Sequence, residues 1–188
     1  MSLAKLVLAK ENSILGIDAS TRSIAFCLFK DNVPIKWGEV YFDGADVYER
    51  ILDARNKVRE IIKEIPSDFV AIEAAVMVRS ASTGLKMAYI FGAIMGELIS
   101  DGRKVVEVHP ITWQSYIGNK NFTNAEKKKV KDAYPDKSAN WQKGKIREIR
   151  KQKTIDFCKG LGVNVESDNV ADACGIAWYA VKNLMRSS

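Results

Sequence analysis

The stretch that decides the fold is residues 14–23, which read ILGIDASTRS. Apolar and small residues lead into Asp18, and the residues after Ser23 are apolar again. The pattern predicts a strand over 13–18 and an antiparallel return strand over 23–30. A carboxylate at the end of a buried strand costs free energy unless it is solvated, paired or bound to a cation. Asp18 is therefore the first candidate functional residue.

Two further segments place acids in a similar setting. Residues 69–73 read FVAIE, and residues 168–172 read DNVAD at the start of an apolar helix. Carboxylate oxygens are the ligands that Mg²⁺ prefers in proteins. Acids on three separate elements therefore predict a site for a hard divalent cation, with Asp18, Glu73 and Asp172 at its core.

Hydrophobic periodicity predicts the other elements. We expect strands at 13–18, 23–30, 33–42, 69–72 and 105–108, and helices at 45–64, 82–100, 110–116, 141–160 and 168–186. The segment that follows Gly118 contains Pro135 and many polar residues, so we expect it to be partly mobile up to the helix at 141. This order is that of the ribonuclease H-like α/β fold, a mixed five-stranded sheet flanked by helices. In that fold Asp18 and Glu73 would be neighbours, and the last helix would bring Asp172 over them.

Length and composition agree with one domain. The chain has 188 residues, of which 47% are hydrophobic, and this suits a single α/β unit. No apolar run approaches the roughly 18 residues of a membrane span, and Lys5 and Lys10 interrupt the N-terminal apolar stretch, so no signal peptide is expected. Cys27, Cys158 and Cys174 form no CxxC pair. We interpret them as reduced core residues of a cytoplasmic protein.

The net charge of +6 is concentrated in one segment. Residues 120–153 carry twelve Lys and Arg against four acids, whereas the rest of the chain carries seventeen against nineteen. A basic segment on a nearly neutral body predicts contact with a polyanion; the alternative is a solvated helix face. The candidate phosphate contacts are Arg79, Lys86, Lys120, Lys127, Lys128, Lys129, Lys143, Lys145, Arg147 and Arg150.

These motifs together resemble those of the RuvC-type Holliday-junction resolvases over most of the chain. Residues 16–18 (GID) are similar to the first acidic motif of that family. Residues 71–73 (AIE), with 77–86 after them, resemble the second motif, and residues 171–177 (ADACGIA) resemble the last. The basic insert at about 119–153 and residues 113–118 (WQSYIG) look closer to the phage-encoded branch than to the cellular one.

The resemblance implies a crossover junction endodeoxyribonuclease that acts as a homodimer on four-way DNA junctions. Such an enzyme nicks two opposed strands symmetrically with Mg²⁺ or Mn²⁺. With two ions in each active site, Asp18 would bridge both ions, Glu73 would hold the ion on the water side and Asp172 would hold the other. On the helix at 82–100, the small residues Gly92, Ala93 and Gly96 would allow a second copy to approach closely.

The chain departs from the cellular pattern at two positions. Val76 stands where cellular members carry an aromatic residue that wedges into the junction. Asn169 stands three residues before Asp172, where they carry an acid. Asp168, four residues before Asp172, lies on the same helix face. We expect Asp168 to be the fourth ligand because it brings charge, although an Asp at a helix start also acts as a cap.

Other functions remain open at this point. His109, the only histidine, follows a strand, where a structural role is more common than a role as a base. Trp113 and Tyr116 have the spacing of core packing. A sugar kinase or related ATPase would need two large lobes, which 188 residues cannot build. The alternatives are another ribonuclease H-like nuclease that acts on branched DNA or RNA, and a non-catalytic nucleic-acid-binding module.

Overall fold

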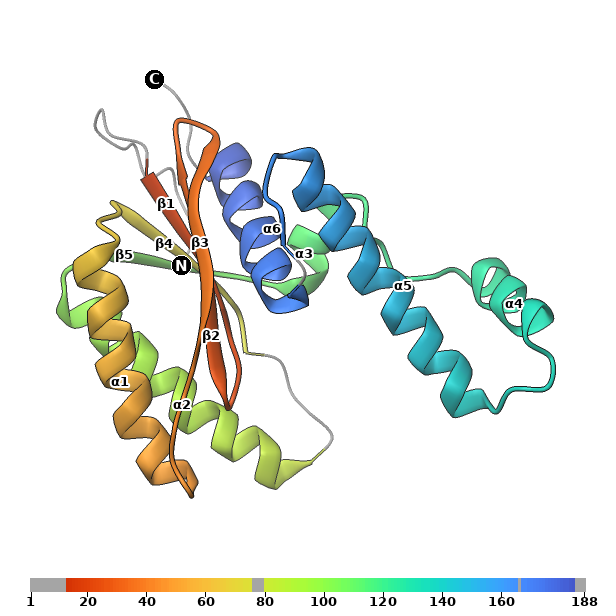
Figure 1. Ribbon diagram of the computed structural model, residues 1–188, viewed down its shortest axis with the longest axis horizontal. Coiled ribbons are helices and arrows are strands. Elements are labelled where there is room, and N and C mark those ends of the chain that lie inside the picture. Colours follow the sequence, from red (N-terminus) through yellow and green to blue (C-terminus); the bar gives the residue numbers. More distant parts are fainter. Residues whose placement is uncertain (1–12, 76–79, 166, 185–188) are drawn as a thin grey trace.

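The computed structural model describes residues 13–75, 80–165 and 167–184 (Figure 1). A mixed five-stranded sheet in the order β3-β2-β1-β4-β5 forms its centre. The strands are β1 (Ser13–Ala19), β2 (Ser23–Lys30), β3 (Val33–Tyr41), β4 (Phe69–Glu73) and β5 (Lys104–Val108). The helices are α1 (Val47–Glu64), α2 (Ala81–Ser100), α3 (Pro110–Tyr116), α4 (Asn124–Ala133), α5 (Ala139–Gly160) and α6 (Asp168–Asn183). The predicted ribonuclease H-like arrangement is confirmed, and the bounds of the predicted elements differ by at most three residues.

The sheet combines an antiparallel meander with a parallel half. Strand β2 runs antiparallel to β1 and β3, and a two-residue turn at Asp31 and Asn32 joins β2 to β3. Both turn residues have positive φ, 47° and 68°, as this type of hairpin turn requires. Strand β4 is parallel to both β1 and β5. The parallel pairing brings the C-terminal ends of β1 and β4 to the same edge of the sheet.

Helices cover both faces of the sheet (Figure 1). Helices α1 and α2 pack on one face, against side chains such as Leu15, Ile17 and Val70. Helix α6 packs on the other face and contacts β1, β2 and β4. The approach of α6 to β1 depends on Gly16, because a side-chain carbon at that position would collide with the backbone of Ala173. This packing sets α6 directly above the C-terminal end of β1.

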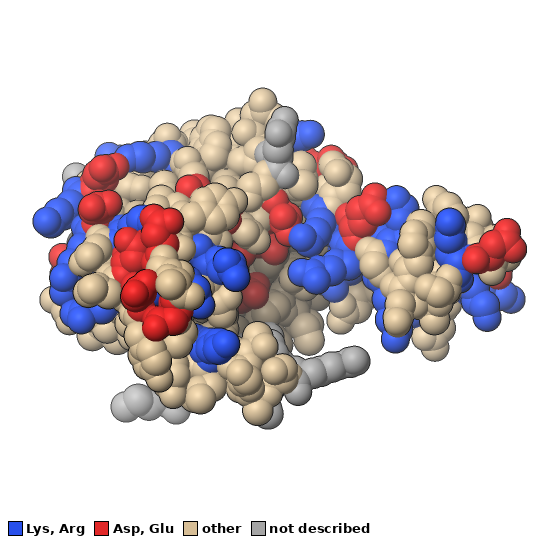
Figure 2. Space-filling view, turned by 60° about the horizontal axis from the view of Figure 1, so that its bottom comes forward, with Lys and Arg blue, Asp and Glu red and all other residues tan. Residues whose placement is uncertain are grey.

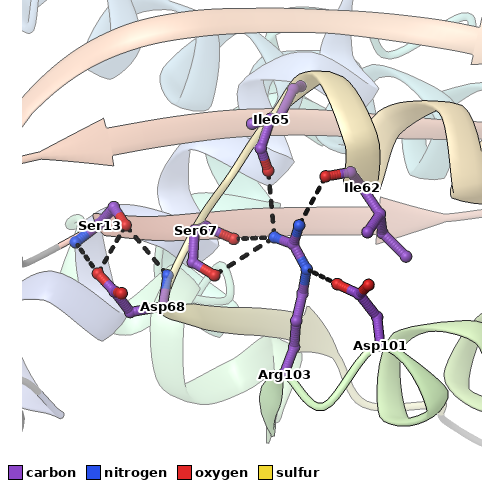
Figure 3. A network of polar contacts seen from close by, with 7 residues as sticks. All are labelled: Ser13, Ile62, Ile65, Ser67, Asp68, Asp101 and Arg103. Carbon is purple, nitrogen blue, oxygen red and sulfur yellow. Dashed lines mark hydrogen bonds and ion pairs between the residues drawn. The ribbon is translucent and has the colours of Figure 1, made fainter.

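Arg103 precedes β5, at the end of the strands away from Asp18. It holds the C-terminal end of α1 there (Figure 3). Its guanidinium donates to the carbonyl oxygens of Ile62 at 2.7 Å and Ile65 at 3.1 Å, at the C-terminal end of α1. It also pairs with Asp101 at 2.8 Å. The carbonyl groups of a last helical turn have no partner within the helix, so Arg103 supplies the missing donors. It thereby fixes the connection that leads into β4.

The structure corrects the expectation for the basic segment. Residues 124–133 form helix α4, and α5 begins at Ala139, so the two helices form an arm that projects from the body (Figure 1). A capping box starts α4, in which Thr123 and Glu126 satisfy each other's backbone N–H groups. The rings of Tyr134 and Trp141 pack at 4.8 Å and close the turn between the helices. Pro135 therefore lies in the turn of a helical hairpin.

Candidate active site

One row of the sheet carries three acidic side chains. Asp18 on β1 lies opposite Ala25 on β2, and Ala25 lies opposite Glu39 on β3. On the other side, Ile17 is level with Ile72 of β4, so Glu73 is level with Asp18. Residues directly opposite each other in neighbouring strands point to the same face. Because Ala25 packs beneath α6, this row faces that helix.

Helix α6 brings the remaining acids over the row. Asp168 is its first residue, and Asp172 follows one turn later on the same face. Burial raises the pKa of Asp18 well above its usual range, and the charges of Glu73, Asp172 and Asp168 raise it further. Burial, followed by the charges of Glu73 and Asp168, raises the pKa of Asp172 to about 7. The four acids predicted from the sequence therefore lie close enough to repel one another.

These acids have the chemistry of a hard-cation site. Desolvated carboxylates that raise one another's pKa are stabilised by a divalent cation, which takes oxygen ligands. Within the described ranges, however, no three His, Cys, Asp or Glu side chains are gathered into a ready-made metal centre. Two of the acids instead accept from protein donors: Asp168 forms an ion pair with Lys151 of α5, and Glu73 accepts a hydrogen bond from Trp113.

Trp113 connects Glu73 to the core. Its indole Nε1 donates to Glu73 Oε2 at 2.8 Å, and its ring is fully buried. Gly175 of α6 makes room for that ring, because a Cβ there would lie 2.6 Å from it. Burial raises the pKa of Glu73, while the hydrogen bond from Trp113 opposes this shift. The sequence interpretation of Trp113 as a core residue omitted this bond, although a buried indole N–H normally has a partner.

Sequence reasoning also missed Glu39. Its carboxylate accepts hydrogen bonds from Ser167 and Asn169, each at 2.7 Å, at the start of α6. Asn169 is the alternative to Asp168 as the fourth ligand. Its side-chain amide donates a hydrogen bond to Glu39, whereas Asp168 forms an ion pair with Lys151. One signal in the sequence could have identified Glu39. Side chains alternate between the two faces along β3, and the strand register then puts Glu39 on the same face as Asp18.

His109 has a structural place. It is the N-cap of α3, and its Nδ1 accepts a hydrogen bond from the backbone N–H of Ile111 at 3.3 Å. Pro110 follows at the first helical position, where its missing N–H leaves no donor unsatisfied. The structural interpretation of this residue thus agrees with its contacts.

Most of the candidate phosphate contacts lie on the arm, where Lys and Arg side chains gather (Figure 2). Lys120, Lys127, Lys128, Lys129, Lys143 and Arg147 are exposed there, and Lys86 is exposed on α2. Lys145 pairs with Glu148 at 2.7 Å. Arg150 differs, because its guanidinium donates to Gln114 at 2.6 Å and also contacts Asn119. Arg150 therefore fastens the base of the arm. Arg79 and Val76 lie outside the described residues.

Comparisons with known proteins bear on the family and the fold. The chain matches the sequence profile of the family described as crossover junction endodeoxyribonuclease RuvC over residues 14–133, which runs from β1 to α4. Asp168 and Asp172 follow the matched range. Among curated protein sequences, none matches the chain significantly.

Solved structures share the fold at low sequence identity. Thermus thermophilus RuvC in complex with a Holliday junction substrate is 14% identical, with a TM-score of 0.62 over 89% of this chain and 91% of that one. Another structure of Thermus thermophilus RuvC is 15% identical, with a TM-score of 0.61 over 89% and 92% of the two chains. The yeast mitochondrial Holliday junction resolvase is 10% identical, with a TM-score of 0.58 over 96% and 81%.

The profile match covers more than half of the chain. Every described helix is too short or too polar to cross a bilayer. The protein belongs to the RuvC family of crossover junction endodeoxyribonucleases.

Proposed function

We propose that this protein resolves four-way DNA junctions by nicking two opposed strands symmetrically, through two-metal hydrolysis of the phosphodiester bond. The observation that carries the proposal is that Asp18 of β1, Glu73 of β4 and Asp172 of α6 are partly desolvated carboxylates on the same side of the sheet, with Asp168 one turn away from Asp172. In this proposal the chain acts as one nuclease domain, and residues 119–153 form a basic insert. The structure of a RuvC bound to a Holliday junction supports the choice of substrate.

The four acids have separate tasks in this proposal. Asp18, Glu73, Asp172 and Asp168 would hold Mg²⁺ or Mn²⁺, and a pair of such ions activates water and stabilises the leaving oxygen. Asp18 would hold the ions together with the other three acids, because the charges of Glu73, Asp172 and Asp168 all act on it. Trp113 keeps the Glu73 carboxylate in one orientation through its hydrogen bond. Lys151, beside Asp168, places a positive charge where a DNA phosphate would approach.

The arm is the proposed surface for the DNA backbone. Its exposed cations on α4 and α5 are Lys127, Lys128, Lys129, Lys143 and Arg147. Acidic side chains lie in the recess between the body and the arm (Figure 2). Because Lys151 of α5 pairs with Asp168, DNA held on the arm would have its phosphates close to the carboxylates.

The outer face of α2 is the proposed contact with a second copy. Leu85, Tyr89 and Ile99 are exposed there, and Gly92 and Gly96 have open space beside them. The steps of four, three, four and three residues place all five on one helix face. Two copies related by a twofold axis would match the twofold symmetry of paired cuts in a junction. Sedimentation should give twice the 21.0 kDa of one chain; a species of one chain with junction bound would contradict the dimer.

The direct test compares cleavage of labelled four-way junction, fork, duplex and RNA–DNA hybrid, with and without Mg²⁺. We expect Mg²⁺-dependent paired nicks in the junction in preference to the other substrates. Asp18→Asn should lose orders of magnitude in rate and still bind the junction. Preferred cleavage of fork or hybrid would identify a different ribonuclease H-like nuclease. Junction binding without any cleavage would identify a binding module.

A further inference from the structure

The start of α6 is attached to the sheet through a single carboxylate. Glu39 Oε2 accepts from the hydroxyl of Ser167 and Oε1 accepts from the amide of Asn169, each at 2.7 Å. These two donors flank Asp168 in the sequence. We propose that Glu39 is a positioning residue for the carboxylate cluster: by holding both neighbours of Asp168, it fixes the acids of α6 above those of β1 and β4. This inference rests on the proposed function.

The bond to Ser167 acts on the helix cap itself. Ser167 is the N-cap of α6, and its Oγ accepts from the backbone N–H of Val170 at 3.4 Å. The same hydroxyl donates its proton to Glu39, so the rotamer that caps the helix is the rotamer that reaches β3. The direction in which α6 leaves its cap, and with it the position of Asp172 one turn later, is thereby tied to the edge strand.

The strand register gives this attachment a defined reference. Glu39 and Asp18 occupy the same row, separated only by the small and fully buried side chain of Ala25. An attachment at Glu39 therefore sets the position of α6 relative to Asp18 across three strands. Val170 and Ala171 of the first turn also pack in the core, and Glu39 adds directional polar contacts on the two residues that flank Asp168.

Electrostatics connect Glu39 with the carboxylate cluster. The negative charge of Glu39 is one of the charges that raise the pKa of Asp18, so its presence has a cost for Asp18. Burial also acts against the ionised form of Glu39, but hydrogen bonds from Asn169, Ser167 and neighbouring side chains lower its pKa overall. The carboxylate stays ionised beside other carboxylates because it is held by donors at the start of α6.

The test uses Glu39→Ala and Glu39→Gln, with Glu64→Ala and Glu64→Gln as matched controls. Glu64 is an exposed acid that pairs with Lys36 at 3.4 Å, away from the cluster. Mn²⁺ affinity is measured by calorimetry without DNA, and the single-turnover cleavage rate is measured against Mg²⁺ concentration. Loss of a residue that orients metal ligands costs about 10–100-fold in metal affinity or activity. We expect that loss in Glu39→Ala, a smaller loss in Glu39→Gln, and unchanged junction affinity in Ca²⁺.

The controls separate this role from the proposed function. If Glu39→Ala unfolds, the same measurements on Ser167→Ala and Asn169→Ala test the inference instead. Combining either change with Glu39→Gln should add little to the loss, because all of them act through one contact. Glu39 variants that bind Mn²⁺ and cleave like the Glu64 variants would overturn the inference, while loss of cleavage in Asp18→Asn would still support the nuclease. If the wild-type protein binds Mn²⁺ but cuts no junction, the proposed function fails and the calorimetry still decides the role of Glu39. A wild-type protein that binds no Mn²⁺ overturns both.

Discussion

Trp113 donates its indole N–H to Glu73 across 2.8 Å, from a ring that is fully buried between α3, β4 and α6. The bond joins the hydrophobic core to an acid of the candidate active site. Burial raises the pKa of Glu73, and the indole N–H favours the ionised form. A core residue thus has an electrostatic effect on the site.

Trp113→Phe should keep most of the packing and remove this donor. The pKa of Glu73 then rises further, because a hydrogen bond to the ionised form is lost. Glu73 holds a cation only when it is ionised, so the cleavage rate should fall most at low pH. The acidic limb of the pH–rate profile should therefore shift to higher pH. Trp178→Phe, a similar change on α6 away from Glu73, is the control. An unshifted acidic limb in Trp113→Phe would show that the bond has no such role.

Asp172→Asn should make the protein more stable at alkaline pH in the absence of divalent cations. The folded-state pKa of Asp172 is raised to about 7, above its unfolded value of 3.8. Stability is therefore lost as pH rises from about 4 to about 7, at up to about 1.4 kcal/mol for each unit. The neutral Asn avoids this loss. Calorimetric melting of the variant and the wild type near pH 8 and below pH 4 measures the difference in stability between them. This difference should vanish below pH 4, and Mg²⁺ should reduce it near pH 8. Equal melting at both would contradict the raised pKa.

Replacement of Lys127, Lys128 and Lys129 by Ala should weaken binding to DNA of every shape. Each phosphate contact that is lost reduces the slope of log affinity against log salt by about 0.9. Fluorescence anisotropy at several salt concentrations gives the slope. Replacement of Lys30, Lys36 and Lys63, exposed lysines of the body, removes the same charge and is the control. Equal slopes for the two triple variants would mean that the arm carries solvated charge only.

Asp168→Ala and Asn169→Ala should differ in their demand for Mg²⁺. Asp168 brings charge and lies beside Lys151, whereas the amide of Asn169 is already held by Glu39. We expect the Mg²⁺ concentration for half-maximal cleavage to rise more in Asp168→Ala than in Asn169→Ala. Melting temperatures identify any loss that comes from helix stability alone, since Ser167 is the cap and Asp168 is the first residue of α6, where a negative charge favours the helix. The opposite order would make Asn169 the fourth ligand.

The sequence predicts the strands and the positions of Asp18 and Glu73 at their C-terminal ends well, because both depend on local patterns. An apolar run that ends on Asp18 or Glu73 indicates a buried strand, and it also indicates an acid at the end of that strand. Helix α4 is harder to predict, since Lys-rich residues followed by Pro135 suggest an irregular segment; the capping box at Thr123 and Glu126 is the local signal for it.

Contacts between distant segments are the part that local patterns do not reveal. Glu39 and Ser167 are 128 residues apart, and Trp113 and Glu73 are 40 apart. Nothing near Glu39 in the sequence indicates that α6 begins above it. Similarly, Arg150 is one cation in a basic segment of the sequence. Only the fold shows that its guanidinium donates hydrogen bonds to Gln114 and Asn119.

Gly175 has no functional group, yet the space around it leaves no room for a side chain. Any side chain there meets the Trp113 ring at 2.6 Å, and that ring holds Glu73. A displacement of the ring by α6 is transmitted to the carboxylate through one hydrogen bond. In a library of random variants selected for nuclease activity, position 175 should therefore retain glycine nearly as strictly as position 18 retains aspartate.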